Sequence, residues 1–255
     1  MTVPSPFPRS GGYPDWVQAL CVGGNALGSL EALADRLSLQ PGNRVLDLGC
    51  GRGASSLFLA REFGVQVWAV DIAFDLGEKQ AAFEQFGVAD RCFALRADAR
   101  ALPFAPGFFD HVVCINSYGY FGTDDKYLPY LAQFVAAGGY LALADIGFAE
   151  EPTDPSALPP PLATDYPTWW AHVHSPAWWR HHLGKQQLFR VVHSGPAAHQ
   201  TALRHAYLKW PYGPSPDAFA QALAAPRADQ ALVFWELVAE RTALPPRLET
   251  YLPTP

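Results

Sequence analysis

An apolar segment that runs directly into alternating glycines is the feature that most constrains this chain. Residues 45–48 are apolar apart from one aspartate, and three glycines follow at every second position: Gly49, Gly51 and Gly53. A helical pattern then covers residues 55–63, and a second apolar segment, 67–70, ends on Asp71. Glycines let a ligand approach the backbone, the helix N-terminus favours an anion, and an acid at the second strand end can accept from ribose hydroxyls. This order predicts a nucleoside-binding strand–helix–strand unit.

Two further apolar segments also end in polar residues. Residues 92–97 lead to Asp98-Ala99, and residues 111–115 lead to Asn116. Open α/β sheets bind ligands at the carboxyl ends of their strands, so these residues are expected at the same edge as Asp71. Asp47 stands inside the first strand, where it is expected to fix the glycine loop or to receive an ammonium group.

The glycine pattern by itself also allows a dinucleotide site. Gly49, Gly51 and Ala54 satisfy the G-x-G-x-x-A form of the dinucleotide fingerprint, which makes an NAD-type oxidoreductase an alternative. Asp47 counts against it, because dinucleotide folds usually carry an apolar residue there. Asp98 at the third strand end also counts against it, and no matching substrate domain follows.

With these motifs the chain resembles the class I S-adenosylmethionine-dependent methyltransferases, over roughly residues 40–150. Pro103-Phe104 before Phe109-Asp110, and Gly138-Gly139 before a fifth apolar segment, are similar to the same family. The resemblance implies an α/β, doubly wound, Rossmann-like fold with a mostly parallel seven-stranded sheet. Helices would cover both faces, and a cap insertion would follow the fifth strand. A looser resemblance, over residues 121–125 and 174–180, points to a type 11-like branch acting on small molecules.

The resemblance also implies a cofactor, a reaction and a set of binding residues. The cofactor would be S-adenosyl-L-methionine and the product S-adenosyl-L-homocysteine, after methyl transfer to a small-molecule acceptor. The amino-acid end would lie over the glycines, the ribose on the acid of the second strand, and the adenine beside the residue after that acid. The predicted cofactor-binding residues are Asp47, Gly49, Cys50, Gly51, Asp71, Ile72, Asp98, Ala99 and Asn116.

No linker or internal repeat divides the 255 residues, so one domain in four parts is expected. Residues 1–40 would form an N-terminal arm and helices, 41–147 the cofactor-binding core, 148–185 the cap, and 186–255 the completion of the sheet. Within the last part, 188–193 predicts a sixth strand. Residues 231–241 suit a reversed seventh strand under the family pattern, although periodicity alone allows a helix equally.

The acceptor pocket is expected between the fourth strand end and the cap. The cap is rich in proline, and four tryptophans crowd into residues 169–179. The residues predicted to line the pocket are Tyr13, Tyr120, Trp169, Trp170 and Trp178. Tyr118 and His174 are the candidate catalytic residues, and His174 would be the base if a proton must be removed, because imidazole titrates near neutral pH. A capping or packing role for His174 is the alternative.

Composition restricts the remaining function classes. A net charge of −6 argues against an extended nucleic-acid surface, and no apolar run reaches the ~20 residues of a membrane span. Four widely spaced cysteines and the absence of a signal-like N-terminus predict a cytoplasmic protein with reduced thiols. No metal site is expected, since the histidines at 172–182 lack the cysteine or glutamate partners of a closed set. The target atom, the oligomeric state and a non-catalytic protein of the same fold all stay open.

Overall fold

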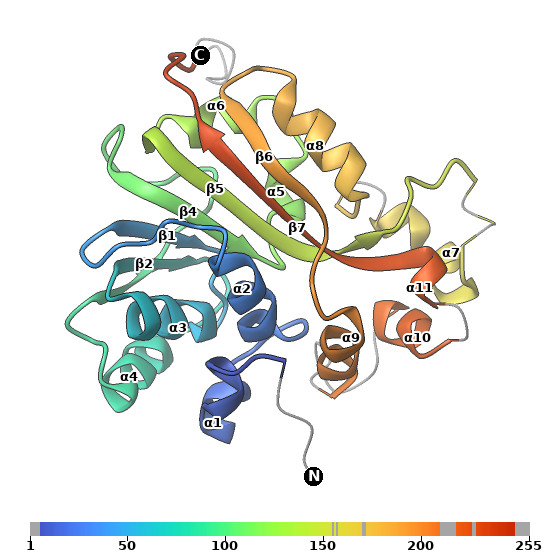
Figure 1. Ribbon diagram of the computed structural model, residues 1–255, viewed down its shortest axis with the longest axis horizontal. Helices are drawn as coiled ribbons and strands as arrows, with labels where there is room; N and C mark the ends of the chain where they lie inside the picture. Colours follow the sequence, from blue (N-terminus) through green and yellow to red (C-terminus); the bar gives the residue numbers. More distant parts are fainter. Residues whose placement is uncertain are drawn as a thin grey trace.

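The computed structural model describes residues 6–154, 156, 158–169, 172–209, 218–225 and 228–247. A twisted sheet runs through the middle of the molecule and helices cover both of its faces (Figure 1). The strands are β1 (Arg44–Leu48), β2 (Gln66–Asp71), β3 (Cys92–Arg96), β4 (Phe109–Ile115), β5 (Val135–Phe148), β6 (Phe189–Pro196) and β7 (Leu232–Arg241).

The seven strands lie in the order β3-β2-β1-β4-β5-β7-β6. Strands β1 to β5 pair in parallel, whereas β7 lies between β5 and β6 and is antiparallel to both. The α/β, doubly wound, mostly parallel sheet expected from the sequence is confirmed. The segment 231–241, which periodicity left ambiguous, is a strand. It is buried along nearly all of its length, and a strand covered on both faces reads as a continuous apolar run.

The connections between strands are mainly helical. The helices before β5 are η1 (Ser10–Gly12, 3₁₀), α1 (Asp15–Gln18), α2 (Ala26–Ala34), α3 (Ala54–Phe63), α4 (Leu76–Phe86), α5 (Gly119–Gly122) and α6 (Tyr127–Ala132). Those after it are α7 (Pro160–Trp169), α8 (Pro176–Gly184), α9 (Gln200–Lys209), α10 (Ala218–Ala224) and α11 (Ala228–Ala231). Helices α7 and α8 form the insertion expected after the fifth strand.

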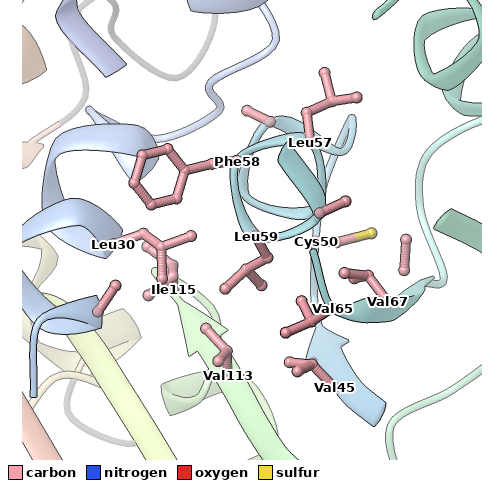
Figure 2. Packing of buried hydrophobic residues seen from close by; sticks show 14 of the residues in the cluster. Leu30, Val45, Cys50, Leu57, Phe58, Leu59, Val65, Val67, Val113 and Ile115 are labelled. Carbon is pink, nitrogen blue, oxygen red and sulfur yellow. The ribbon is translucent and has the colours of Figure 1, made fainter. Parts of the chain in front are cut away.

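Two apolar cores hold the helices against the sheet. On one face, side chains of α2 and α3 such as Leu30 and Phe58 pack over Val45 and Val113 of the sheet (Figure 2). On the other face, α6 and α8 pack against the sheet, and Trp179 is among the buried side chains there. Helices α9 and α10 share a third core with the start of β7, which brings the C-terminal insertion beside the carboxyl end of β5 (Figure 1).

Local sequence explains where the insertion helix α8 begins. The Ser175 hydroxyl accepts from the backbone N–H of Trp178 at 3.2 Å, and Pro176 occupies the first helical position. A Ser-Pro pair is typical of such a helix start. Earlier in the chain, Thr123 follows the short helix α5, and α6 begins after Lys126.

Candidate functional site

A cavity of about 500 Å³ opens at the carboxyl ends of the parallel strands. Its walls come from the loops after β1, β2, β3 and β4 and from the last part of β5, together with residues 20–26, residues 172–173 and helices α9 and α10. Most of the lining is apolar. This volume is within the range of about 300–1,000 Å³ that small-molecule sites occupy. The carboxyl ends of the first four strands were predicted to meet at one edge of the sheet. They do meet there, around this cavity.

The first wall is the glycine loop after β1. Gly49 has a φ of +74°, and a Cβ at this position would overlap the hydroxyl of Ser117. The Ser117 hydroxyl in turn donates to the carbonyl of Leu48 at 3.0 Å. Glycine is therefore required at position 49 both by its backbone angle and by the close approach of the β4 loop.

Asp71 at the end of β2 faces the same loop. Its Oδ2 accepts from the backbone N–H of Gly51 at 2.9 Å, and its Oδ1 accepts from those of Ala73 at 2.7 Å and Phe74 at 3.4 Å. Oδ2 keeps a second lone pair, and the side chain lines the cavity. Asp71 can therefore accept from a ligand hydroxyl while it holds the loop.

Asp47 lies behind the loop and does not line the cavity. Its Oδ2 accepts from the hydroxyls of Ser55 and Ser56, each at 2.6 Å. Burial raises the pKa of its carboxyl to about 6, against the opposing effect of these two bonds. Of the two roles predicted for Asp47, the position supports bracing the loop and does not support direct contact with a ligand.

Lys79 of α4 is a site residue that sequence reasoning missed. Its ammonium group donates to the carbonyl of Gly51 at 3.3 Å, and the side chain is 1% exposed. Its charge also lowers the pKa of Asp47, which opposes the larger effect of burial. A lysine in an otherwise polar helix reads as a solvated residue, so the sequence carries no signal for this contact.

The loops after β2 and β3 form a second part of the cavity. Ile72 is 55% exposed and lines it together with Asp98, Ala99 and Arg100. Asp98 accepts from the backbone N–H of Arg100 at 2.8 Å. The Arg100 guanidinium donates to the carbonyl of Tyr120 at 2.8 Å and so ties this loop to α5. An apolar side chain beside a carboxylate suits a planar base with an exocyclic amine.

Asn116 connects the β4 end to the N-terminal segment. It has a φ of +57°, which asparagine tolerates better than most residues. Its side-chain amide donates to the carbonyl of Gly23 at 3.1 Å. Leu20, Val22 and Gly23 thereby form a wall of the cavity.

Tyr13, predicted to close that side, lies elsewhere. Its hydroxyl donates to Glu62 at 2.7 Å, and its ring packs against Phe58 and Phe86. The prediction that Tyr13 lines the pocket is wrong, because the apolar core beside α3 and α4 takes its ring.

The predicted aromatic residues of the cap divide into two groups. Tyr120 lines the cavity and lies beside His172, with ring centroids 5.5 Å apart. Trp178 does not line it: its ring is stacked between His174 at 3.7 Å and His182 at 4.6 Å. The side chain of Trp169 and the whole of Trp170 lie outside the described residues.

Neither candidate catalytic residue lines the cavity. Tyr118 is 1% exposed and packs edge-on against Trp179 on the far side of the β4 loop. Nδ1 of His174 lies 2.8 Å from the carboxylate of Glu151, and its ring stacks on Trp178. Both side chains pack against helix α8 of the cap, which is the alternative given for His174.

Three residues of the acceptor half were not predicted. Asp145 lies near the carboxyl end of β5, Tyr207 lies in α9 and Phe219 lies in α10, and all three line the cavity. Burial raises the pKa of the Asp145 carboxyl to about 7. The strand-end rule that found Asp71 and Asp98 would also have found Asp145, since it ends the fifth apolar segment. Only the fold brings Tyr207 and Phe219 to the site.

The described part of the chain contains no group of three or more His, Cys, Asp or Glu side chains placed to hold a metal ion. It also contains no helix with the length and apolar character needed to cross a membrane.

Comparison with curated proteins identifies relatives of the central part of the chain. A family model described as a methyltransferase domain matches residues 45–139. The methyltransferase GfsG of Streptomyces halstedii is 34% identical over 117 residues, which are 46% of this chain and 42% of that protein. The O-methyltransferase resE of Aspergillus sclerotiorum is 32% identical over 124 residues, which are 48% of this chain and 47% of that protein. The chain thus aligns with less than half of each of these relatives.

Solved structures share the fold over more of the chain. A putative sarcosine dimethylglycine methyltransferase from Galdieria sulphuraria has a TM-score of 0.65 at 19% identity, covering 86% of this chain and 87% of its own. Geranyl diphosphate C-methyltransferase from Streptomyces coelicolor A3(2), in complex with Mg2+, geranyl diphosphate and S-adenosyl-L-homocysteine, has a TM-score of 0.67 at 18% identity. That match covers 85% of this chain and 80% of the other.

Proposed function

Residues 45–139 are a methyltransferase domain of the class I, S-adenosylmethionine-dependent type, and from this premise we propose that the chain methylates a small-molecule acceptor. The observation that carries the proposal is the single cavity at the strand ends. Nucleoside-binding groups form one half of it, and a largely apolar chamber forms the other.

The residues of the first half fit the cofactor. The turn at Gly49 leaves no room for a side chain, so the backbone itself forms this wall. The Asp71 carboxylate is already oriented by three backbone N–H groups and keeps a lone pair on Oδ2 for a ribose hydroxyl. Ile72 would cover a face of the adenine, with Asp98 and Ala99 at its edge.

When bound, S-adenosylmethionine supplies a methyl group that its positive sulfur makes electrophilic. The work left to the protein is alignment of the acceptor and exclusion of water. Confinement of two reactants in one geometry can contribute several kcal/mol, up to about 7–11 in favourable cases. Ile146, Val173 and Phe219 would confine an acceptor body from three different segments of the chain.

The acceptor class follows from charge and shape. A net charge of −6 and a cavity enclosed by α9, α10 and the cap favour a small molecule over a nucleic acid. All four cysteines are free, which suits a reducing compartment such as the cytoplasm.

Calorimetric titration with S-adenosylhomocysteine and with NAD tests the proposal. We expect binding of the first and none of the second. Asp71→Ala should weaken S-adenosylhomocysteine binding at least tenfold, about 1.4 kcal/mol. Asp90→Ala, which removes an exposed carboxylate next to Arg91, should leave the affinity unchanged.

A matched unfolding experiment on both variants shows whether Asp71→Ala also loosens the fold. Tight NAD binding would instead support the oxidoreductase alternative. Unaltered S-adenosylhomocysteine affinity in a folded Asp71→Ala variant would remove the ribose assignment.

A further inference from the structure

Asp145 occupies a position that the cofactor half of the site does not use. It lies near the carboxyl end of β5, opposite Trp235 of β7 and one residue after Ala144, which pairs with Ile115 of β4. The strand is paired on both sides at this point, and the Asp145 side chain is half-buried. It nevertheless remains accessible from the cavity that it lines.

Apolar side chains form most of the lining of the cavity that Asp145 reaches. Ile146, Val173 and Phe219 are among them, and Tyr120 and Tyr207 also line it. The hydrogen bond that the structure shows for Asp145 is its own Oδ1 accepting from the Ile146 N–H at 2.8 Å. Among the described residues no Lys, Arg or His lies close enough to form an ion pair with it. Oδ2 is therefore free to accept a proton from a ligand.

The electrostatics agree with this geometry. Burial raises the pKa of Asp145 to about 7, and the hydrogen bond from Ile146 only partly opposes it. From β4, the Cys114 thiol faces the same carboxyl: burial, with a smaller contribution from Asp145, raises its pKa well above the usual range. The other titratable or charged groups around the cavity are Cys50, Asp71, Asp98, Arg100, Tyr120, His172 and Tyr207.

We propose that Asp145 is the catalytic base of this site and that the acceptor is a phenol with an otherwise apolar body. This inference rests on the methyl transfer proposed above. The Asp145 carboxylate takes the proton of the phenolic hydroxyl while the oxygen forms its bond to the methyl carbon. The carbon–sulfur bond of the cofactor breaks and its electron pair stays on sulfur. The products are a methyl ether, neutral S-adenosylhomocysteine and protonated Asp145, which returns its proton to water.

A phenol matches this base better than the other acceptor types. A phenolic hydroxyl has a pKa near 10, about three above that of Asp145, whereas an aliphatic alcohol is a far weaker acid. An amine that enters as an ammonium ion has no lone pair with which to attack the methyl carbon, and an ion pair with the Asp145 carboxylate would hold it in that form.

Binding of simple probes tests the inference without knowledge of the natural acceptor. The protein is saturated with S-adenosylhomocysteine and titrated with 4-propylphenol, 4-propylanisole or 4-propylbenzylamine at pH 6 and pH 8. A base that titrates near pH 7 is mostly protonated at the lower pH and mostly ionised at the higher. We therefore expect 4-propylphenol to bind up to about tenfold more tightly at pH 8. The anisole, which has no proton to donate, should show no such dependence.

Two variants separate a base from a packing group. Asp145→Asn should abolish the pH dependence of phenol binding and change S-adenosylhomocysteine affinity less than twofold. Besides Asp145 and the tyrosines, His172 is a titratable residue that lines the acceptor half. His172→Gln removes its imidazole, and phenol binding to this variant should keep its pH dependence. With S-adenosylmethionine in place of the product, mass spectrometry should detect the methyl ether with the wild type and a loss of at least a hundredfold in Asp145→Asn.

Each outcome decides the inference. Failure of the wild type to bind S-adenosylhomocysteine overturns the proposed function itself. Binding of S-adenosylhomocysteine without any binding of 4-propylphenol, or with phenol binding that does not depend on pH, overturns only the role of Asp145. Preference for 4-propylbenzylamine assigns an amine acceptor, and loss of the pH dependence in His172→Gln assigns the base to His172. Either of these results also overturns the inference.

Discussion

The ammonium group of Lys79 donates to the carbonyl of Gly51 from a side chain that is almost completely buried. On the other side of the glycine turn, Asp71 accepts from the N–H of the same residue. The peptide groups on either side of Gly51 are thus held by a positive group and a negative group from two different elements. Asp47 accepts from Ser55 and Ser56 of α3 and so ties the strand before the turn to the helix after it. The loop is a preformed wall rather than a flexible one.

Lys79→Met should weaken this wall. The substitution keeps the length of the side chain but leaves the Gly51 carbonyl without its donor and removes the charge that lowers the pKa of Asp47. We expect S-adenosylhomocysteine affinity to fall about tenfold and the free energy of unfolding to fall by about 1–3 kcal/mol. Calorimetry and urea unfolding measure the two effects. Lys126→Met, at an exposed lysine, is the control, and equal behaviour of the two variants would contradict the role of Lys79.

The adenine assignment can be tested with a changed ligand. An inosine analogue of S-adenosylhomocysteine has a carbonyl where the parent has the exocyclic amine, so it cannot donate to Asp98. We expect it to bind the wild type about tenfold more weakly than the parent. In Asp98→Asn, which keeps an oxygen to accept from the Arg100 N–H, the difference between the ligands should shrink. Equal affinities in the wild type would remove Asp98 from the adenine site.

Gly119 in α5 allows the cap to reach the site. A Cβ at this position would overlap the carbonyl oxygen of His172, a backbone atom that cannot move by rotating a side chain. We expect Gly119→Ala to lower the free energy of unfolding by about 1–3 kcal/mol, because the segment of His172 must move away. Gly184→Ala is the matched control, because its Cβ would meet no atom within 4 Å. Similar unfolding curves for the two variants would show that the cap docks without this close approach.

The raised pKa of Asp145 also predicts how stability depends on pH. The usual value of this carboxyl is 3.8 and the folded value is about 7, so the folded state binds the proton more tightly than the unfolded chain does. The stability that this protonation supplies is complete below pH 3.8 and is lost as the pH rises toward 7. Asp145→Asn should therefore match the wild type near pH 4 and exceed it by about 1–3 kcal/mol at pH 8, allowing for the water that the cavity admits. Chemical unfolding at several pH values measures the difference, and a constant difference would contradict the raised pKa.

The cofactor half of the site could be predicted because its chemistry is local. Strand, glycine turn and terminal acid lie within about thirty residues, and the rule that strand ends meet at one edge places Asp98 and Asn116 without further information. Gly49, Asp71 and Asn116 all line the cavity as that rule required.

The acceptor half depends on directions and distances that the sequence does not encode locally. Tyr118 and His174 are next to cavity residues in the chain, yet their side chains point into the cap, where Trp178 and Trp179 supply larger apolar contacts. Lys79 was missed because its partner lies 28 positions earlier in the chain. Asp145 also falls under the strand-end rule, but β5 continues beyond it to Phe148, so the sequence does not show that the cavity opens at position 145.

The placement of Tyr207 and Phe219 has a consequence for the diversity of such proteins. The matched domain ends at residue 139, and both side chains come from helices that follow it by more than sixty residues. The part of the molecule that would grip the methyl donor and the part that would choose its recipient are therefore encoded in separate stretches of the gene. A lineage could exchange the latter stretch and acquire a new recipient while leaving the donor machinery untouched. The same division indicates that acceptor specificity could be engineered by grafting segments after residue 139 while residues 45–139 are kept.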